Sequence, residues 1–157
     1  MVRCGEESWL RRPLSIHQLA EAKLALLFAV VGKGTHWLAQ CRVGDSVDLL
    51  GPLGNGYSIQ PDSRNLLLVA GGLGIAPLYF LAQEALKQGC SVTLLLGAPT
   101  ATQLYPGDLL PPRVELVIAT EDGTSGKRGV ITDFLPDFAR WSDQIFACGP
   151  VAMYRAI

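Results

Sequence analysis

The segment that most constrains the fold is a strand-like apolar run followed at once by glycines and a helix-like run. Residues 66–70 are continuously apolar, glycines recur within the next four positions, and residues 77–88 look helical before Gly89. A short apolar run of this kind is typical of a buried strand. Glycines directly after a strand let a phosphate approach the backbone at the start of the next helix. The same pattern also fits a plain strand-to-helix turn that needs positive φ angles.

The rest of this half of the chain repeats the alternation of strands and helices. Further strands are expected at residues 91–96, 114–119 and 144–147, and further helices at 131–140 and 151–157. Alternation at this spacing indicates βαβ units and a parallel sheet. Ligands of such sheets bind beyond the carboxyl ends of the strands. We therefore expect an α/β domain over residues 63–157.

The preceding residues 1–62 read as a separate, β-rich domain that ends at a polar turn, Pro61-Asp62-Ser63. Strands are expected at residues 24–31 and 47–50, and a short helix at 35–40 with Thr35 as its N-cap. So few strands make a thin barrel, and we expect its opening strands to be absent from this chain.

Composition excludes several classes of protein. Of the 157 residues, 49% are apolar and 17% are charged, with a net charge of -1, which argues against disorder and against a nucleic-acid partner. The longest apolar run, residues 24–31, is far shorter than the roughly 20 residues of a membrane-spanning helix. No leader pattern is visible, and the four cysteines form no CxxC pair, so we expect a cytoplasmic protein without a metal site.

Two short motifs in the first half offer groups that suit phosphates. In Leu10-Arg-Arg-Pro-Leu-Ser-Ile16, Arg12 offers a forked cation for a pyrophosphate and Ser15 a hydroxyl for a ring nitrogen or carbonyl. A solvated basic turn is the alternative. In Gly32-Lys-Gly-Thr-His36, Thr35 and free backbone amides suit a phosphate, with a capped surface helix as the alternative. The lone histidines at positions 17 and 36 are expected to have surface or packing roles.

The last strand ends in Cys148-Gly-Pro150, where the start of a helix favours partial thiolate character, although a small buried side chain is the alternative. The glycine-rich segment departs from the dinucleotide fingerprint, because Pro77 stands where its third glycine belongs. The second strand ends in Gly-Ala-Pro at residues 97–99, without an acidic residue. Both departures disfavour a standard NAD-dependent Rossmann dehydrogenase.

Taken in order, the motifs RPxS, GxGT, GPLGxG, GGxGxAP and CGPxxM resemble the ferredoxin–NADP reductase superfamily. Within that superfamily, the phrases RRPLSI, VVGKGT, GPLGNGY, LLVAGGLGIAPL and FACGPVAMYRAI are most similar to the electron-transfer subunits of dihydroorotate dehydrogenases, enzymes of pyrimidine biosynthesis. The resemblance covers nearly the whole chain. It implies a partial FAD-binding β-barrel followed by an NAD-binding α/β domain with a parallel sheet.

The resemblance also implies roles for individual residues. Ser15 and Cys148 would be the catalytic residues, close to the reactive parts of the flavin and the nicotinamide. The residues that would bind FAD are Arg12, Pro13, Leu14, Ser15, Leu27, Phe28, Ala29, Gly34 and Thr35. Those that would bind NAD are Gly71, Gly72, Gly74, Ala76, Pro77, Glu121, Cys148, Gly149 and Pro150.

The choice of NAD over NADP follows from one difference. NADP-using relatives place a Ser-Arg pair after the third strand, whereas this chain has Thr120-Glu121-Asp122. A carboxylate there would repel a 2′-phosphate and accept a hydrogen bond from a ribose hydroxyl. The alternative is that both carboxylates only solvate a loop.

Three departures from the superfamily pattern bear on function. We expect the opening strands of the barrel, which precede the segment matching Met1 in the superfamily, to be absent, and their absence would expose an edge of the barrel. The chain stops before the cluster-binding cysteines of its relatives, so it holds no iron–sulfur cluster as given. Ala29 stands where relatives usually carry Arg.

The expected function is transfer of hydride from NADH to FAD, with electrons passing on to a dehydrogenase subunit or another protein acceptor. A stand-alone NADH-dependent flavin or ferredoxin reductase is a second interpretation. A third is a non-catalytic nucleotide-binding fragment that oligomerises through the open barrel edge.

Overall fold

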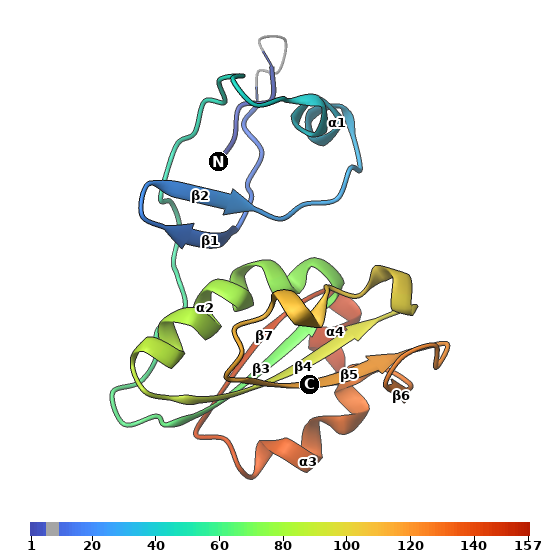
Figure 1. Cartoon of the computed structure of the whole chain (residues 1–157). Helices are drawn as coiled ribbons and strands as arrows, with labels where there is room; N and C mark the ends of the chain where they lie inside the picture. The colour runs from blue at the N-terminus through green and yellow to red at the C-terminus, as the bar shows by residue number, and fades with distance from the viewer. Residues whose placement is uncertain (6–9) are drawn as a thin grey trace.

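The computed structural model describes residues 1–5 and 10–157, which form two stacked parts (Figure 1). The larger C-terminal part is built on a five-stranded sheet with the strand order β6-β5-β4-β3-β7, in which all neighbouring strands are parallel. Its strands are β3 (Asn65–Gly71), β4 (Ser91–Ala98), β5 (Val114–Thr120), β6 (Lys127–Arg128) and β7 (Gln144–Cys148). The parallel sheet expected from the alternating pattern is confirmed.

Helices cover both faces of this sheet. The main helix is α2 (Ile75–Lys87), which lies on the face toward the N-terminal part, while α3 (Leu135–Ala139) lies on the opposite face (Figure 1). The last helix is α4 (Val151–Ala156). Short 3₁₀ turns complete the connections: η1 (Gly72–Gly74), η2 (Ala101–Gln103), η3 (Gly107–Leu109) and η4 (Ile131–Phe134).

The core is divided by the sheet into two layers, because successive side chains of a strand point to opposite faces. On one face, Leu66 and Leu68 of β3 pack with α2 residues such as Leu78. On the other, Leu67 and Val69 pack with Ile131, Met153 and their neighbours. Residues 66–70 are fully buried, as expected for a strand covered on both faces. The sheet is therefore a rigid platform for the loops at its carboxyl edge.

The N-terminal part contains little regular structure. An antiparallel ribbon of β1 (Ile16–Ala20) and β2 (Lys23–Leu26) lies over α2, and α1 (Lys33–Gln40) lies beyond it (Figure 1). Isolated bridges join Val2 to Arg12 and to Leu49. The strand β1 was not expected from the sequence, since its pattern IHQLA is too short and polar to stand out.

Two strand predictions for this part are wrong in extent. The run 24–31 is a strand only as far as Leu26, because β2 pairs with the five-residue β1 and nothing pairs with it beyond that point. The predicted strand at 47–50 is reduced to the single bridge at Leu49. A β-strand needs a hydrogen-bonded neighbour along its length. Residues 48–50 bond only to the short segment 1–3, through Arg3 N–H to the Asp48 carbonyl and Leu50 N–H to the Met1 carbonyl, which is too short a pairing to form a regular strand.

The helix predicted at 35–40 exists but begins earlier, so Thr35 is not its N-cap. Gly32 caps α1, and Thr35 stands three positions later. The Thr35 hydroxyl accepts the backbone N–H groups of Val31 and Gly32 and donates to the Gly32 carbonyl. Because Gly32 has no side chain, only one half of a capping box is present, in which the Thr35 hydroxyl in the first turn of α1 bonds back to the backbone at the N-cap.

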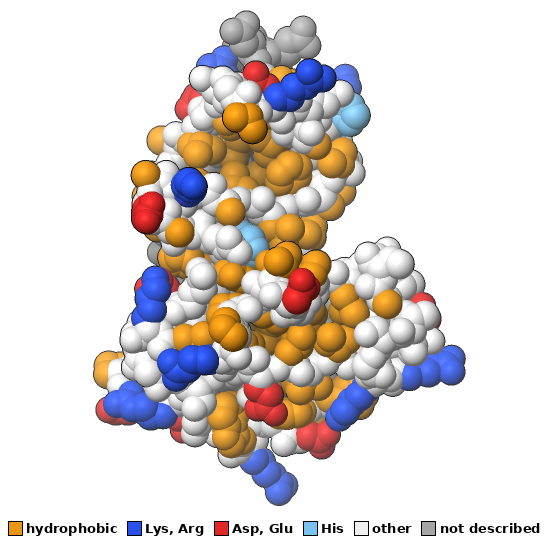
Figure 2. All heavy atoms as spheres, in the orientation of Figure 1, with side chains coloured by type: hydrophobic (Ala, Val, Ile, Leu, Met, Phe, Trp, Pro, Cys, Tyr) orange, Lys and Arg blue, Asp and Glu red, His pale blue; other side chains and the backbone are white. Residues whose placement is uncertain are grey.

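On the face drawn in Figure 2, hydrophobic side chains gather in a hollow of the N-terminal part. Independently of that view, large apolar side chains remain exposed along this part. They include Leu19, Leu24, Val30, Val31, Val43, Leu49, Leu50 and Leu53. No helix among the described residues is long and apolar enough to cross a membrane. The four cysteines are free thiols.

Candidate functional site

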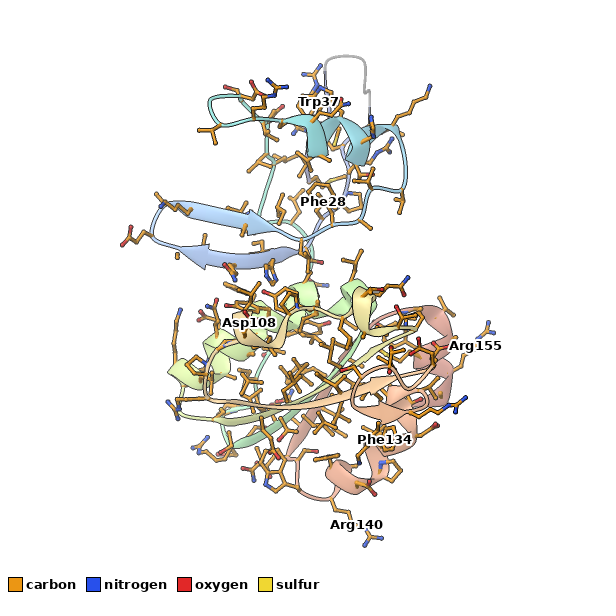
Figure 3. The ribbon with its side chains drawn as sticks, turned by 45° about the vertical axis from the view of Figure 1, so that its right-hand side comes forward. Phe28, Trp37, Asp108, Phe134, Arg140 and Arg155 are labelled. Carbon is orange, nitrogen blue, oxygen red and sulfur yellow. The ribbon has the colours of Figure 1, made fainter. Side chains whose placement is uncertain are left out.

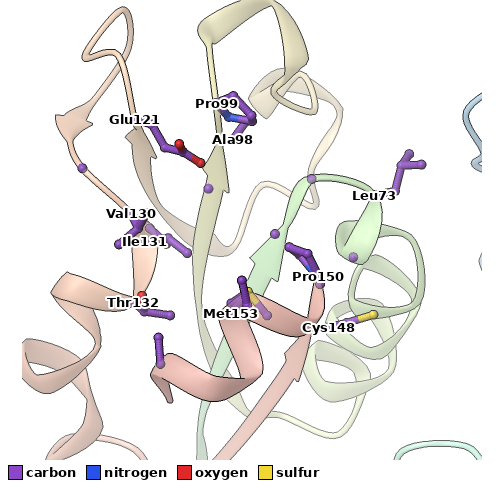
Figure 4. Close-up of a pocket in the computed structure, with 18 of the residues that line it drawn as sticks. Leu73, Ala98, Pro99, Glu121, Val130, Ile131, Thr132, Cys148, Pro150 and Met153 are labelled. Carbon is purple, nitrogen blue, oxygen red and sulfur yellow. The ribbon is translucent and has the colours of Figure 1, made fainter.

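A cavity of about 680 Å³ opens at the carboxyl edge of the sheet (Figure 4). Its size lies within the range of small-molecule and cofactor sites. The ends of β3, β4, β5 and β7 all contribute, through Gly72, Ala98, Glu121 and Cys148. This is where a parallel sheet presents its ligand site. Among the described residues of the N-terminal part, Ser15 alone lines the cavity.

Two glycine turns at the floor of the cavity are packed against each other. A Cβ on Gly74 would overlap the carbonyl group of Cys148, and one on Gly71 would come within 2.8 Å of Pro150 Cδ. A Cβ on Gly149 would lie 2.7 Å from Met153 Cε. The motifs GGLG and CGP therefore require each other, since only glycine lets the β3–α2 turn touch the end of β7.

Gly72 plays a different part in the same turn. Its φ of +53° is in the left-handed region, and a Cβ there would meet nothing within 4 Å. The backbone at Gly72 is thus exposed to the cavity, immediately before the N-terminus of α2. Backbone N–H groups and the positive end of the helix dipole make such a turn suitable for phosphate oxygens. The interpretation as a turn that needs positive φ is confirmed at Gly72, and the phosphate cradle stays a prediction.

The two adjacent carboxylates after β5 have different surroundings. Asp122 accepts hydrogen bonds from the backbone N–H and the hydroxyl of Thr124, and these bonds hold the pKa of its carboxyl below the usual value. Glu121 lines the cavity (Figure 4), and its carboxylate makes no hydrogen bond or ion pair within the described part of the chain. Asp122 is therefore committed to its own turn, whereas Glu121 is available to a ligand.

Glu121 and Cys148 stand on opposite sides of the cavity (Figure 4). Glu121 directly follows β5, and Cys148 is the last residue of β7. In the sheet, β4 and β3 lie between these two strands. Three strand spacings amount to about 14 Å. The cavity is thus elongated across the strand ends, as an extended ligand with two recognised ends would require.

Two tyrosines flank the Cys148 end, and the sequence pattern did not single them out as site residues. The hydroxyls of Tyr57 and Tyr154 both donate to the Ala147 carbonyl, at 3.3 and 3.4 Å, and Tyr154 also accepts the Gly149 N–H. Burial raises the pKa of Tyr57, and the neighbouring Cys148 raises it further. The turn after β7 is thus held by side chains from both parts of the molecule.

In the N-terminal part, Arg12 and Gly34 come together. A Cβ on Gly34 would lie 3.0 Å from Arg12 Nε, so the arginine side chain lies against the first turn of α1. The first backbone N–H groups of a helix have no partner within it. Thr35 is buried, and its hydroxyl is occupied by the capping bonds. Only its backbone N–H is left for a phosphate.

The remaining predicted residues of the N-terminal part lie outside the cavity. Pro13 is exposed and Leu14 half-buried between Arg12 and Ser15. Leu27 packs against the core beside α2, whereas Phe28 lies between the ribbon and α1 (Figure 3). Ala29 is exposed. None of these three belongs to a strand, because β2 ends at Leu26.

The structure brings together most of the residues predicted around the nicotinamide nucleotide. Those that line one cavity are Gly71, Gly72, Gly74, Pro77, Glu121, Cys148, Gly149 and Pro150. Ser15, predicted to bind FAD, lines the same cavity. Ala76 is buried in the first turn of α2 and does not line it. The sequence reading missed the lining residues of the β6–η4 connection and of α4, namely Gly129, Val130, Ile131, Thr132, Ala152, Met153 and Ala156. These are small or apolar side chains without a chemical signature.

Residues 68–157 match a family model described as the oxidoreductase NAD-binding domain. The chain belongs to this oxidoreductase NAD-binding domain family. The match begins within β3 and includes every part of the cavity except Ser15. No group of three or more metal-ligating side chains occurs among the residues described here.

Curated relatives of the chain within this family share one description. A dihydroorotate dehydrogenase B (NAD(+)) electron transfer subunit of Desulforamulus reducens is 42% identical, over 99% of this chain and 62% of the relative. The subunit of Bacillus caldolyticus is 38% identical over the same shares. The chain thus spans about 62% of the length of the curated relatives it matches.

Two solved structures resemble this chain over nearly its whole length. A structure titled as an NADH-dependent reduced ferredoxin-NADP oxidoreductase superposes with a TM-score of 0.84 at 35% identity, covering 97% of this chain and 56% of the other. The ferredoxin reductase of carbazole 1,9a-dioxygenase gives a TM-score of 0.82 at 20% identity, covering 99% and 52%. The fold is that of ferredoxin reductases, with an antiparallel barrel-like part before the NAD-binding domain.

Proposed function

We propose that this chain is a flavin-dependent electron-transfer protein that takes hydride from NADH and delivers electrons to a protein acceptor. It would be an NAD(P)H:acceptor oxidoreductase of the kind found as the electron-transfer subunit of dihydroorotate dehydrogenase. One observation carries the proposal: Ser15, from the RPLS motif, and Cys148, from the CGP motif, line the same cavity although they come from different parts of the molecule. A cavity shared in this way suits two cofactors that meet.

The C-terminal part fits an NAD dinucleotide. The open backbone at Gly72 and the N-terminus of α2 would hold the pyrophosphate. Glu121 would accept hydrogen bonds from the adenosine ribose, and its negative charge would exclude a 2′-phosphate. Cys148, Gly149 and Pro150 would border the nicotinamide, placing the two ends of the ligand at opposite sides of the cavity.

The N-terminal part fits the phosphate side of FAD. Arg12 against Gly34 and the first N–H groups of α1 form one cationic, donor-rich corner. We place the boundary of this partial FAD-binding domain at Asp62, before β3. Bound FAD would supply hydride acceptance followed by one-electron transfer. The role left to the protein is positioning, with Ser15 directed at the cavity where the two ligands would meet.

The exposed apolar hollow of the N-terminal part supports an acceptor protein or a second copy as partner. Contiguous exposed apolar patches on a protein surface are typical of interaction surfaces. The exposed large apolar side chains of this part come from β1, β2 and the segments on either side of α1, within the part that would hold the flavin. A stand-alone flavin or ferredoxin reductase uses the same site, and it differs from the leading proposal only in the acceptor.

A visible absorption spectrum of the full chain, before and after anaerobic NADH, tests the proposal. We expect flavin bands after purification or after added FAD, and we expect NADH to bleach them. Dihydroorotate dehydrogenase catalytic subunits and ferredoxin, added in turn as acceptors, separate the two enzyme assignments. A chain that takes up no FAD at saturating concentration contradicts the flavin assignment, and titration with NADH then tests the nucleotide site by itself.

A further inference from the structure

His17 is the one histidine buried between the two parts of the molecule, and the proposed function assigns it no role. It is 6% exposed, where the ribbon crosses α2. Its Nδ1 lies 3.3 Å from the Ala76 carbonyl oxygen, and its Nε2 lies 3.1 Å from the Tyr105 hydroxyl. The imidazole therefore joins β1, the first turn of α2 and the segment before η3.

The partners fix the protonation of the ring. A carbonyl oxygen only accepts, so Nδ1 carries the hydrogen and donates it to Ala76. In the neutral ring Nε2 then accepts the Tyr105 hydroxyl hydrogen. The rings of Tyr79 and Tyr105 lie 4.5 and 5.3 Å from the imidazole, centroid to centroid, and close it in.

The backbone aims His17 at this position. The pairing register of β1 and β2 shifts between Ile16 and Gln18, which leaves His17 as the extra residue of a β-bulge. Bulges redirect a side chain and are common beside active sites. Ser15 lines the cavity two residues earlier, and Ala76 stands between the lining residues Gly74 and Pro77. The hydrogen bond from His17 to Ala76 therefore ties the strand that follows Ser15 to the floor of the cavity.

We propose that His17 is the positioning residue that docks the β1–β2 ribbon onto α2 and so holds Ser15 at the cavity wall. This inference rests on the proposed function, because that function gives the position of Ser15 its purpose. The specific feature is the paired hydrogen bonding of one neutral ring, which a merely space-filling residue would not need.

The titratable groups around the ring are consistent with a neutral His17. Burial lowers its pKa, and the Ala76 carbonyl opposes this only partly. The facing groups are Tyr79 from α2 and Tyr105, whose pKa is raised first by burial and then by Tyr79 and Asp108. Asp108 belongs to η3, on the side of the C-terminal part that faces the ribbon (Figure 3). Protonation would make Nε2 a donor in place of an acceptor toward Tyr105. We therefore expect acid to weaken the contact between the β1–β2 ribbon and α2.

Amide hydrogen exchange and NADH titration of the full chain test the proposal. His17→Phe keeps a ring but loses both hydrogen bonds, and Tyr105→Phe loses one of them. We expect His17→Phe to speed exchange over residues 15–26 by about tenfold, with β3 and β4 unchanged, and to weaken NADH binding by a comparable factor. His17→Asn keeps a donor at the Nδ1 position, so we expect it to recover part of the slow exchange and part of the NADH affinity that His17→Phe loses.

Tyr79→Phe is the matched control, because the Tyr79 hydroxyl makes no hydrogen bond within the described residues. It is expected to behave like the wild type. Faster exchange in all strands alike, or wild-type exchange and affinity in His17→Phe, would overturn the proposal. A wild-type chain that fails to bind NADH overturns the proposed function instead, while the exchange pattern still decides the docking role.

The nitrogen spectrum of the imidazole gives a second, independent readout. In a His36→Gln background only one imidazole remains. We expect its nitrogen shifts at neutral pH to show the neutral tautomer with the hydrogen on Nδ1. The opposite tautomer contradicts the bond to Ala76 and with it the docking role.

Discussion

At the scale of single residues, we expect charge to decide which nucleotide the cavity accepts. Glu121 lines the cavity with its carboxylate unengaged, and the next residue, Asp122, is tied to Thr124. Of these two adjacent carboxylates, Asp122 stabilises its own turn, and Glu121 is the one left free to contact a ligand. Only Glu121 should control cofactor preference.

Glu121→Arg is expected to shift the ratio of NADH to NADPH affinity toward NADPH by at least about tenfold. The substitution removes a repulsive charge and adds a charge-assisted partner for a 2′-phosphate. Titrating both nucleotides into each variant measures the ratio. Asp122→Asn is the control, and an unchanged ratio in Glu121→Arg removes Glu121 from the site.

Arg12→Ala is expected to weaken FAD binding by about 1.5–3 kcal/mol, the value of one charge-assisted hydrogen bond. The neighbouring Arg11 is already paired with Asp48 at the surface, so Arg11→Ala is a matched control with little expected effect. FAD titration monitored by flavin fluorescence gives both affinities. Equal affinities for wild type and Arg12→Ala would exclude Arg12 from the phosphate corner.

At the scale of elements, the two turns that follow β3 and β7 form one packed unit. Gly71 and Gly74 from the first turn meet Cys148, Gly149 and Pro150 from the second with no room for a Cβ. Cofactor contact and core packing therefore place separate demands on neighbouring glycines. Substitutions can separate these demands.

Gly74→Ala is expected to lower the free energy of unfolding by about 3 kcal/mol or more, because the new methyl group would overlap the backbone at the end of β7. Gly72→Ala has open space and suffers only the strain of its positive φ, about 1–2 kcal/mol. Urea unfolding measures both. Equal losses would contradict the packing of the two turns.

Asp143 joins the starts of β7 and β3, where its carboxylate accepts the backbone N–H groups of Arg64 and Asn65, each at 2.8 Å. These bonds hold its pKa below the ordinary value. The stabilisation they give is present above the unfolded pKa of about 3.9 and is lost as the pH falls through the lower, folded pKa.

Asp143→Ala is therefore expected to lower the melting temperature at pH 7, with a deficit that shrinks below about pH 4. Thermal unfolding at a series of pH values measures the deficit. Asp62→Ala removes a nearby surface carboxylate without such bonds and serves as the control. A deficit for Asp143→Ala that is the same at every pH would exclude the carboxylate as its source.

At the scale of the whole molecule, the two parts differ in how well they cover their apolar side chains. The C-terminal sheet is buried on both faces, whereas the N-terminal part leaves many large apolar residues exposed. The open edge of β2 adds unpaired backbone groups beside them. Self-association through this part is the expected consequence.

Leu24→Lys, on β2, is expected to weaken self-association of the full chain, because it places a charge at the open edge. Trp141→Lys is the matched control: both side chains are 40% exposed, but Trp141 lies in the C-terminal part. Sedimentation at several protein concentrations compares them. Equal weakening by both substitutions would place the contact outside the ribbon.

The sequence predicted the C-terminal part well because its strands are buried on both faces. Residues 66–70 and 91–96 read as strands from local composition alone, and the glycines after them mark the ends at which the cavity opens. The N-terminal part was predicted less well. Residues 47–50 have strand composition, but a strand requires a partner along its length, and composition does not reveal that the pairing with residues 1–3 is so short.

The site shows the same division. Gly72, Glu121 and Cys148 carry recognisable chemistry, and all three were predicted from the residues and the resemblance. The flanking tyrosines and the buried His17 were not. The roles of Tyr57 and His17 depend on contacts with Ala147 and Ala76 across long sequence separations, whereas Tyr154 bonds back to Ala147 within the turn after β7. Nothing local distinguishes a tyrosine that holds a turn from one that packs.

The short helix α4 has a practical consequence for handling the protein. Met153 and Ala156 both line the cavity, and Ala156 is one residue from Ile157. Residues that follow Ile157, or an affinity tag joined directly after it, would therefore start beside the cavity. We expect a tag in that position to interfere with the nucleotide titrations described above.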